Sequence, residues 1–280
     1  MADPVTAYKQ TQRELYAGNA AGWDKWAEAL ADQAERLNLP LIEAGDVTAG
    51  MDVLDLASGA GEPALTAAQA VGPSGHVTAT DLSPEMLAII ERRAAAASVD
   101  HVSCQHADME SLPFPDHCFD RVICRFGFMY SPNPNQALAE IRRVLKPGGR
   151  VALMVWGPTS TNSLLWTVFE TANGITQLYA EDELVHPFCY GAEGSLAPLM
   201  SDAGLAGAEE REIRFQPKIK QGVPFWTPIL EMNFQAAIDS VGTERRAELE
   251  EAVARAFDRF LENGMYEVEM HVRIATATAP

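Results

Sequence analysis

The chain has 280 residues, of which 47% are hydrophobic, and its formal net charge is −18 at pH 7. This amount of apolar material can bury one large core, so a single domain is expected. A strong negative charge repels a phosphate backbone, whose binding depends on clustered Lys and Arg, so we expect no nucleic-acid partner. The acidic excess is interpreted as a solvated surface without a partner of its own.

The four cysteines form no C-x-x-C pair and show no metal-ligand spacing with histidine, so we predict neither a metal site nor a redox motif. Cys104 and Cys124 lie in apolar, strand-like runs, where a free thiol behaves as a small hydrophobic side chain. Residues 1–22 lack the apolar core of a signal peptide, and no segment has the ~20 apolar residues that span a bilayer. A cytoplasmic location is therefore expected.

Before residue 50, six apolar residues recur at helical spacing and share one helical face. Such a face either packs on the core or forms a lid over a bound ligand, and the pattern leaves both interpretations open. The six residues, called the lid face below, are Trp23, Trp26, Ala27, Leu30, Ala34 and Leu37.

From residue 50 to 156, short β-branched runs alternate with helical patterns, which is typical of βαβ units and a mostly parallel sheet. Ser83-Pro84-Glu85 combines an N-cap, a proline at the first helical position and an acid in the first turn, and predicts a helix over 84–97. Another helix is expected over 135–145, because a Lys-Pro-Gly-Gly run ends it. The five expected strands cover 52–56, 76–80, 101–104, 121–124 and 150–155.

Beyond residue 156 this regular alternation is lost. Apolar residues from Leu249 to Leu261 recur at helical spacing and predict one long helix with a single apolar face. The expected helices in this part cover 163–179, 195–203 and 243–262, and the expected strands cover 209–215 and 266–274.

The segment 53–63, with the sequence VLDLASGAGEP, predicts a strand that ends in a glycine-bearing turn and opens a helix. Gly59 and Gly61 lack a Cβ atom, so they permit positive φ and let a ligand approach the backbone closely. Asp81 follows at the end of the second expected strand, where a carboxylate can accept hydrogen bonds from both ribose hydroxyls of a bound nucleoside. The turn also fits the dinucleotide pattern G-x-G-x-x-G/A, so turn and acid predict a nucleoside pocket without distinguishing S-adenosylmethionine (SAM) from NAD.

Two later segments distinguish between these cofactors. Residues 107–120, ADMESLPFPDHCFD, lead into the fourth expected strand, and residues 145–150, LKPGGR, lead into the fifth. With the glycine turn and Asp81 they follow in the right order over about a hundred residues, from Val53 to Val155. This run resembles the class I SAM-dependent methyltransferase family, especially its branch that modifies ubiquinone and menaquinone precursors and other small molecules.

The resemblance implies an α/β fold, namely a Rossmann-like, doubly wound, mostly parallel seven-stranded sheet with helices on both faces and a helical cap. It implies that residues 55–61 hold the methionyl part of SAM, that Asp81 holds the ribose, and that Asp108 accepts from the adenine amino group. Arg125 matches a position that faces the amino-acid part of SAM or the acceptor. The full set implied for the cofactor is Asp55, Ala57, Ser58, Gly59, Gly61, Asp81, Leu82, Met86, Asp108, Met109 and Arg125.

The alternatives for the three acids are ordinary structural roles. Asp55 could only cap a turn, and Asp81 and Asp108 could be solvated surface acids. One departure from the family pattern is visible, because Ala57-Ser58 stands where many relatives carry Gly-Cys or Gly-Ser. We expect this to tighten the pocket slightly.

Methyl transfer from a sulfonium is an in-line displacement, so the enzyme must hold the nucleophile, the methyl carbon and the sulfur collinear. A general base is needed only if the acceptor loses a proton, and the sequence does not identify one. We expect a small, hydrophobic or aromatic acceptor in an apolar cavity that excludes water, because aromatic residues are frequent outside the family-like core. Candidate acceptor contacts are Tyr16, Trp23, Tyr130, His186 and Tyr190.

Residues 1–280 are therefore expected to form one SAM-dependent methyltransferase domain that releases S-adenosylhomocysteine. It would comprise a helical lid over 1–50, a SAM-binding core over 51–156, and core strands with acceptor-binding helical insertions over 157–280. An NAD(P)-dependent oxidoreductase would use the same turn and ribose acid, although a full dinucleotide site needs two mononucleotide-binding halves. A SAM-binding module without catalysis is the third interpretation. The methylated atom and the oligomeric state are left open.

Overall fold

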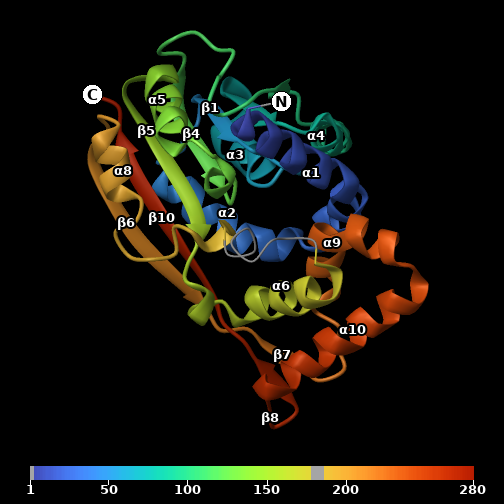
Figure 1. Ribbon diagram of the computed structural model, residues 1–280. Coiled ribbons are helices and arrows are strands. Elements are labelled where there is room, and N and C mark those ends of the chain that lie inside the picture. The colour runs from blue at the N-terminus through green and yellow to red at the C-terminus, as the bar shows by residue number, and fades with distance from the viewer. Residues whose placement is uncertain (1–2, 178–185) are drawn as a thin grey trace.

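The computed structural model describes residues 3–177 and 186–280. Its centre is a seven-stranded sheet of order β3-β2-β1-β4-β5-β10-β6 (Figure 1). The five strands up to β5 are parallel to their neighbours, and β10 runs antiparallel between β5 and β6. The strands are β1 (Asp52–Leu56), β2 (His76–Asp81), β3 (Val102–His106), β4 (Phe119–Arg125), β5 (Leu145–Trp156), β6 (Ala206–Phe215) and β10 (Met270–Thr278).

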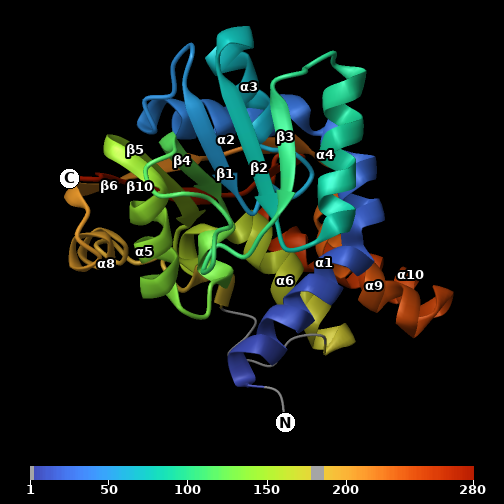
Figure 2. The same ribbon diagram turned by 90° about the horizontal axis from the view of Figure 1, so that it is seen from above.

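Helices cover both faces of this sheet, as Figure 2 shows from above. On one face α2 (Ala31–Ala44), α3 (Ala64–Val71) and α4 (Pro84–Ala96) pack on the sheet in one apolar cluster. On the other face α5 (Pro134–Val144) and α8 (Ala197–Asp202) pack in a second cluster. The doubly wound, mostly parallel α/β sheet predicted from the sequence is confirmed.

The residues predicted to begin α4 and to end α5 do so in the structure. The Ser83 hydroxyl accepts from the Met86 backbone N–H at 3.4 Å and caps α4, with Pro84 at the first helical position. Helix α5 ends at Val144, directly before the Lys-Pro-Gly-Gly run. Because α4 begins right after β2, its start fixes the backbone beside Asp81 at the end of that strand.

A third apolar cluster lies beyond the carboxyl ends of the parallel strands. It joins α6 (Ser163–Thr176), α9 (Thr227–Val241) and α10 (Thr243–Phe257). A small antiparallel sheet of order β7-β9-β8 adds to it, and its strands are β7 (Lys218–Lys220), β8 (Leu261–Glu262) and β9 (Met265–Glu267). Helix α1 (Pro4–Ala29) packs along α9 and extends over the strand ends (Figure 1).

Three expected elements need correction. The lid face belongs to two helices, since α1 ends at Ala29 and α2 begins at Ala31, with Leu30 between them at ψ 10°. The helix expected over 243–262 ends at Phe257, where a short turn leads into β8. The strand expected over 266–274 is split into β9 and β10, because β9 pairs with the small sheet and β10 with the large one. Of the helix expected over 163–179, residues 178 and 179 lie outside the described residues.

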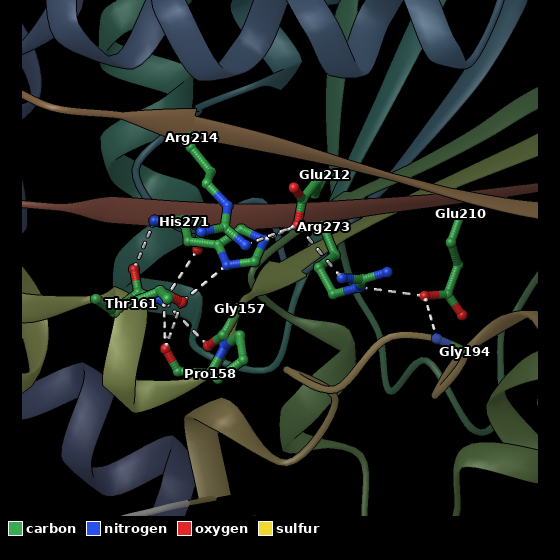
Figure 3. A network of polar contacts seen from close by, with 10 residues as sticks. Gly157, Pro158, Thr161, Gly194, Glu210, Glu212, Arg214, His271 and Arg273 are labelled. Carbon is green, nitrogen blue, oxygen red and sulfur yellow. Dashed lines mark hydrogen bonds and ion pairs between the residues drawn. The ribbon is translucent and has the colours of Figure 1, made fainter.

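A polar network joins the segment before α6 to the beginning of β10 (Figure 3). The buried Asn162 amide donates to the carbonyls of Gly157 and His271 at 3.0 Å, and its oxygen accepts from the His271 N–H at 2.9 Å. On the same strand, Arg273 pairs with Glu210 at 3.2 Å, both nearly buried. Burial and the nearby Arg214 lower the pKa of His271, so its ring stays neutral at pH 7. The network fixes where α6 stands over the strand ends.

Gly22 sets how closely α1 approaches α9. A Cβ atom at this position would lie 2.0 Å from the Glu231 carbonyl oxygen, so Gly22→Ala must push the two helices apart. We expect the variant to lose about 1–3 kcal/mol of unfolding free energy in denaturant titrations. Gly174→Ala in α6, where a Cβ atom meets nothing within 4 Å, should instead gain up to about 1 kcal/mol. Equal effects at both positions would contradict this account of the α1–α9 contact.

Candidate active site

A cavity of about 1060 Å³ lies at the carboxyl ends of the parallel strands. Open parallel sheets bind ligands at this edge, because the loops that follow each strand meet there. Its sheet-side wall, called the cofactor end below, is formed by residues 57–60, 80–83, 86 and 107–110. All six residues of the lid face line the cavity. Leu37 also belongs to the sheet core, and Trp23 and Ala27 pack against a small buried cluster of Ala60, Met86 and Ile89.

The glycine turn after β1 provides an open stretch of backbone. Gly59 has φ +53°, and a Cβ atom built on it meets nothing within 4 Å, so its surface faces open space. Ser58 fixes the turn, since its hydroxyl donates to the Asp55 carbonyl at 3.0 Å and accepts from the Thr80 N–H at 3.1 Å. Ala57 also adopts positive φ, at +52°, which explains why a glycine suits this position. The turn therefore has the shape that a ligand close to the backbone requires.

Asp81 is held by two backbone amides at the end of β2. Its Oδ2 accepts from the Gly59 N–H and its Oδ1 from the Ser83 N–H, both at 2.9 Å. Burial raises the pKa of Asp81, although these hydrogen bonds act in the opposite direction. A carboxylate has about four acceptor positions, so two remain for ribose hydroxyls.

The third strand end contributes Asp108 and Met109, both of which line the cavity with Leu82 and Met86. Asp108 already has a cationic partner, because the Lys9 ammonium of α1 lies 2.6 Å from its Oδ2. Its Oδ1 accepts from the Glu110 N–H at 2.9 Å. Asp108 is thus a paired residue at the cofactor end, and the interpretation of a plain solvated acid does not describe it.

Asp55 and Gly61 do not line the cavity, in contrast to the other residues proposed for the cofactor. The Asp55 side chain lies fully buried beneath the turn, and neither carboxylate oxygen has a hydrogen-bond partner within the described part of the chain. Burial raises its pKa to about 7. A direct contact between Asp55 and the cofactor stays a prediction.

Arg125, at the end of β4, lines the cavity and is positioned from α2. Its Nη1 donates to the Asn38 Oδ1 at 2.8 Å, and Asn38 also donates to Glu62 and Thr66. The Nε–H of Arg125 is buried and has no partner among the residues described. A partly buried guanidinium beside the turn fits an anionic group such as the carboxylate of an amino acid.

Three of the five candidate acceptor contacts, Tyr16, Trp23 and Tyr130, line the cavity. The rings of Tyr16 and Tyr130 meet edge to face with centroids 5.8 Å apart, which joins α1 to the loop after β4. Tyr190 lies elsewhere, packed beside Phe128 in the core cluster of α5. His186 begins a short helical turn, and its side chain is outside what the structure describes.

Sequence reasoning missed several residues of the site. Lys9, Asn38 and Glu62 come from α1, α2 and the glycine turn, and their partners are distant in the sequence. Phe126 also lines the cavity, and it stacks with ring centroids 3.7 Å apart on Trp156, which is one of the aromatic residues expected at the acceptor site. Of the missed residues only Phe126 carried a signal, because it lies two residues after a predicted strand at the ligand-binding edge.

The residues present fit SAM. The open backbone at Gly59, the free acceptor positions on Asp81 and the unpaired Nε–H of Arg125 match a nucleoside joined to an amino acid. In residues 3–177 and 186–280 no group of three or more His, Cys, Asp or Glu side chains could hold a metal ion. The same part of the chain contains no helix of the length and hydropathy that a membrane span requires.

Comparisons with known proteins agree with this site. The sequence profile of the methyltransferase domain matches residues 53–149. The ubiquinone/menaquinone biosynthesis C-methyltransferase of Bordetella avium is 35% identical over 206 residues, covering 69% of this chain and 78% of that protein. The demethylmenaquinone methyltransferase of Listeria monocytogenes is 40% identical over 106 residues, which is 38% of this chain and 45% of the relative.

Solved structures share the fold at lower identity. A SAM-dependent methyltransferase from Aquifex aeolicus has a TM-score of 0.51 at 18% identity, covering 88% of this chain and 93% of its own. The cyclase SpnF has a TM-score of 0.54 at 22% identity, covering 88% of this chain and 81% of its own. Since a protein named as a cyclase has the same fold, the fold alone does not define the reaction.

The sheet order and the sequence relatives define a class I SAM-dependent methyltransferase. Within this family the chain belongs to the ubiquinone/menaquinone-type branch. The family predicted from residues 53–155 is confirmed, and so is SAM as the cofactor.

The buried Asp55 carboxyl makes stability depend on pH. Because its pKa is about 7 in the folded chain and ~3.9 in the unfolded chain, the folded state holds the extra proton between these values. Relative to Asp55→Asn, the wild type should therefore lose about 1.4 kcal/mol of unfolding free energy per pH unit from pH 5 to 7, and level off above. Denaturant titrations across this range measure the difference. The exposed Asp100→Asn serves as control and should run parallel to the wild type, and a parallel profile for Asp55→Asn would refute the assignment.

Proposed function

We propose that this enzyme methylates a small, hydrophobic aromatic acceptor of the quinol type. The observation that carries the proposal is the second wall of the cavity, called the acceptor end below, which is largely apolar and has Arg214, Gln216 and Asn233 as polar members. Such walls bind apolar ligands, and a few polar groups orient them. The acceptor end is lined by Trp156, Leu164, Leu165, Phe169, Phe215, Ile219, Val223, Phe225, Ile229, Met232 and Met270.

The names of the sequence relatives support the choice of a quinol. One acts in ubiquinone and menaquinone biosynthesis, and the other is named for demethylmenaquinone. Flat, aromatic rings match the stacked Phe126–Trp156 pair, which lies where the cofactor end meets the acceptor end of the cavity. A ring carbon as methyl acceptor is part of this proposal.

Within the site, this chain's residues hold and orient both reactants. Asp81 accepts from the ribose, the Gly59 backbone lies against the cofactor, and Arg125 faces its carboxylate. When bound, SAM supplies an electrophilic methyl group at a cationic sulfur. The lid face excludes water from the space between the reactants, which strengthens electrostatic interactions there.

Tyr130 is suited to donate a hydrogen bond to the acceptor. Burial raises the pKa of its hydroxyl, against the lowering effect of a hydrogen bond with Tyr16. The hydroxyl is therefore protonated at pH 7, and it can donate to an oxygen of the acceptor but serves poorly as a base. Tyr16 and Trp23 would complete this polar edge from α1.

We place the whole chain in one methyltransferase domain with the division expected above, namely a lid over 1–50, a cofactor core over 51–156 and acceptor-binding insertions over 157–280. All four cysteines are free thiols, which supports a reducing, cytoplasmic location. The net charge of −18 supports a small molecule over nucleic acid as the partner.

Asp81→Asn tests the cofactor assignment. In the wild type the Gly59 backbone N–H donates to a carboxylate oxygen of Asp81. The side-chain amide of the variant has only one acceptor oxygen, so its NH2 group faces a donor, and the charge-assisted bonds to ribose are lost. The Kd for SAM should therefore rise about 10- to 100-fold. Isothermal titration calorimetry with SAM and with NADH measures this. NADH should give no heat with either protein, and Asp100→Asn should bind SAM as the wild type does. Wild-type protein that binds NADH and ignores SAM would favour the oxidoreductase instead.

Ile229→Trp tests the acceptor end. The larger ring fills part of the apolar wall on α9, so the KM for a water-soluble 1,4-naphthoquinol should rise about tenfold or more, because overpacking opposes ligand entry. SAM affinity should stay within about twofold of the wild type. Leu39→Trp, at an exposed position outside the cavity, is the matched control. A parallel loss of SAM affinity, or an unchanged KM, would contradict the placement of the acceptor.

A further inference from the structure

Lys9 makes the tightest ionic contact between α1 and the cofactor end. Its ammonium lies 2.6 Å from Asp108 Oδ2 and 2.6 Å from Glu110 Oε2, and all three side chains line the cavity. The Lys9 side chain is 20% exposed and that of Glu110 only 5%, so water screens these pairs less than a surface pair.

Glu110 is a fixed anchor for this lysine. Besides Lys9, its carboxylate accepts from the Ser131 hydroxyl at 2.6 Å and from the backbone and side-chain N–H groups of Asn133 at 2.8 and 3.0 Å. These donors outweigh the effect of burial and hold the pKa of Glu110 below its ordinary value. Likewise, Asp108 and Glu110 together overcome burial and raise the pKa of Lys9. Lys9 and Glu110 are therefore both charged at pH 7.

The other half of α1 is fastened to a different part of the molecule. The Asn19 side chain donates to the Asn233 carbonyl and accepts from the Ala236 N–H, both at 3.0 Å, and both partners lie on α9. Lys25 pairs with Glu231 of α9 at 2.6 Å and does not line the cavity. The carboxyl-terminal half of α1 thus packs on α9 and also contacts α4, where Asp24 pairs with Arg92. Lys9 ties the amino-terminal half to the loop after β3.

We propose that Lys9 is a positioning residue of the cofactor site, a cation that clamps the amino-terminal half of α1 over the adenine end and must release Asp108 and Glu110 before the cofactor exchanges. The inference rests on the proposed function, in which Asp108 faces the adenine amino group. The two contacts are compatible, because Asp108 has about four acceptor positions and Lys9 and the Glu110 N–H use two of them. The clamp therefore stays closed with cofactor bound.

Release of S-adenosylhomocysteine is the step that this clamp controls. Lys9→Met keeps most of the apolar stem and removes the charge, so the release rate measured by stopped-flow tryptophan fluorescence should rise about tenfold or more, as the loss of two charge-assisted contacts predicts. High salt should shrink the ratio between variant and wild type, because it screens the wild-type pair. Lys9→Arg, which keeps the charge, should restore much of the slow release.

Lys25→Met is the matched control, since it removes an ion pair of equal length from the same helix outside the cavity. It should leave the release rate unchanged while lowering the melting temperature. Hydrogen exchange adds a second measurement, in which S-adenosylhomocysteine should protect residues 4–16 in the wild type and much less in Lys9→Met.

The outcomes separate the clamp from the cofactor assignment. Wild-type protein that does not bind S-adenosylhomocysteine would overturn the proposed function itself. If the wild type binds S-adenosylhomocysteine and both Lys9→Met and Lys25→Met release it at the wild-type rate, the clamp alone is overturned. If both variants release it equally fast and faster than the wild type, the clamp is also overturned, because the effect would then follow from loosening α1 as a whole.

Discussion

The site depends on one partly buried carboxylate, that of Asp81, which joins the ends of β1 and β2. Asp81 takes an amide hydrogen bond from Gly59 after β1 and another from Ser83 before α4, so a single side chain fixes the glycine turn relative to β2. The arrangement requires positive φ at Gly59 and an N-cap at Ser83, and local sequence supplies both. Burial opposes the charge on Asp81, and the two amides compensate for it only in part. In the cofactor site that we propose, two adjacent ribose hydroxyls would supply further donors to this carboxylate.

The two ends of the cavity are built by different physics. The cofactor end consists of strand ends and short turns whose backbone groups are fixed by sheet pairing, which keeps polar atoms in place to within the tolerance of a hydrogen bond. The acceptor end is formed by the third apolar cluster, in which α6, α9 and the small β7-β9-β8 sheet pack on one another. Apolar packing tolerates substitution more readily than a hydrogen-bond geometry does. This difference explains why the sequence identifies the cofactor but not the acceptor.

The sequence predicted the features of the fold that depend on residues close to one another in the chain. The strand, turn and helix around Gly59 and the cap at Ser83 follow from residues within a few positions of each other, and the structure has them as expected. Contacts over long separations had no such signal: Lys9 and Asp108 are 99 residues apart, and Asn38 and Arg125 are 87. The helix expected over 243–262 is shorter in the structure, because Phe260 and Leu261 continue its apolar spacing but belong to a turn and a strand. Both residues pack in the third apolar cluster. Periodicity reports which residues are buried and not whether the backbone between them is one helix.

The lid face shows why a pattern could not decide between core and ligand site. Trp23, Ala27 and Leu30 present the same apolar surface whether another helix or a bound molecule covers it, since the hydrophobic effect depends on the area removed from water and not on what removes it. What distinguishes the two cases is the polar chemistry beside that surface. A core helix leaves few unpaired polar atoms, whereas here the buried Nε1–H of Trp23 and the buried Oε1 of Gln12 have no partner among the described residues, and both side chains line the cavity. The spacing of apolar residues carries no information on such polar atoms, which is why periodicity alone left the choice between core and ligand site open.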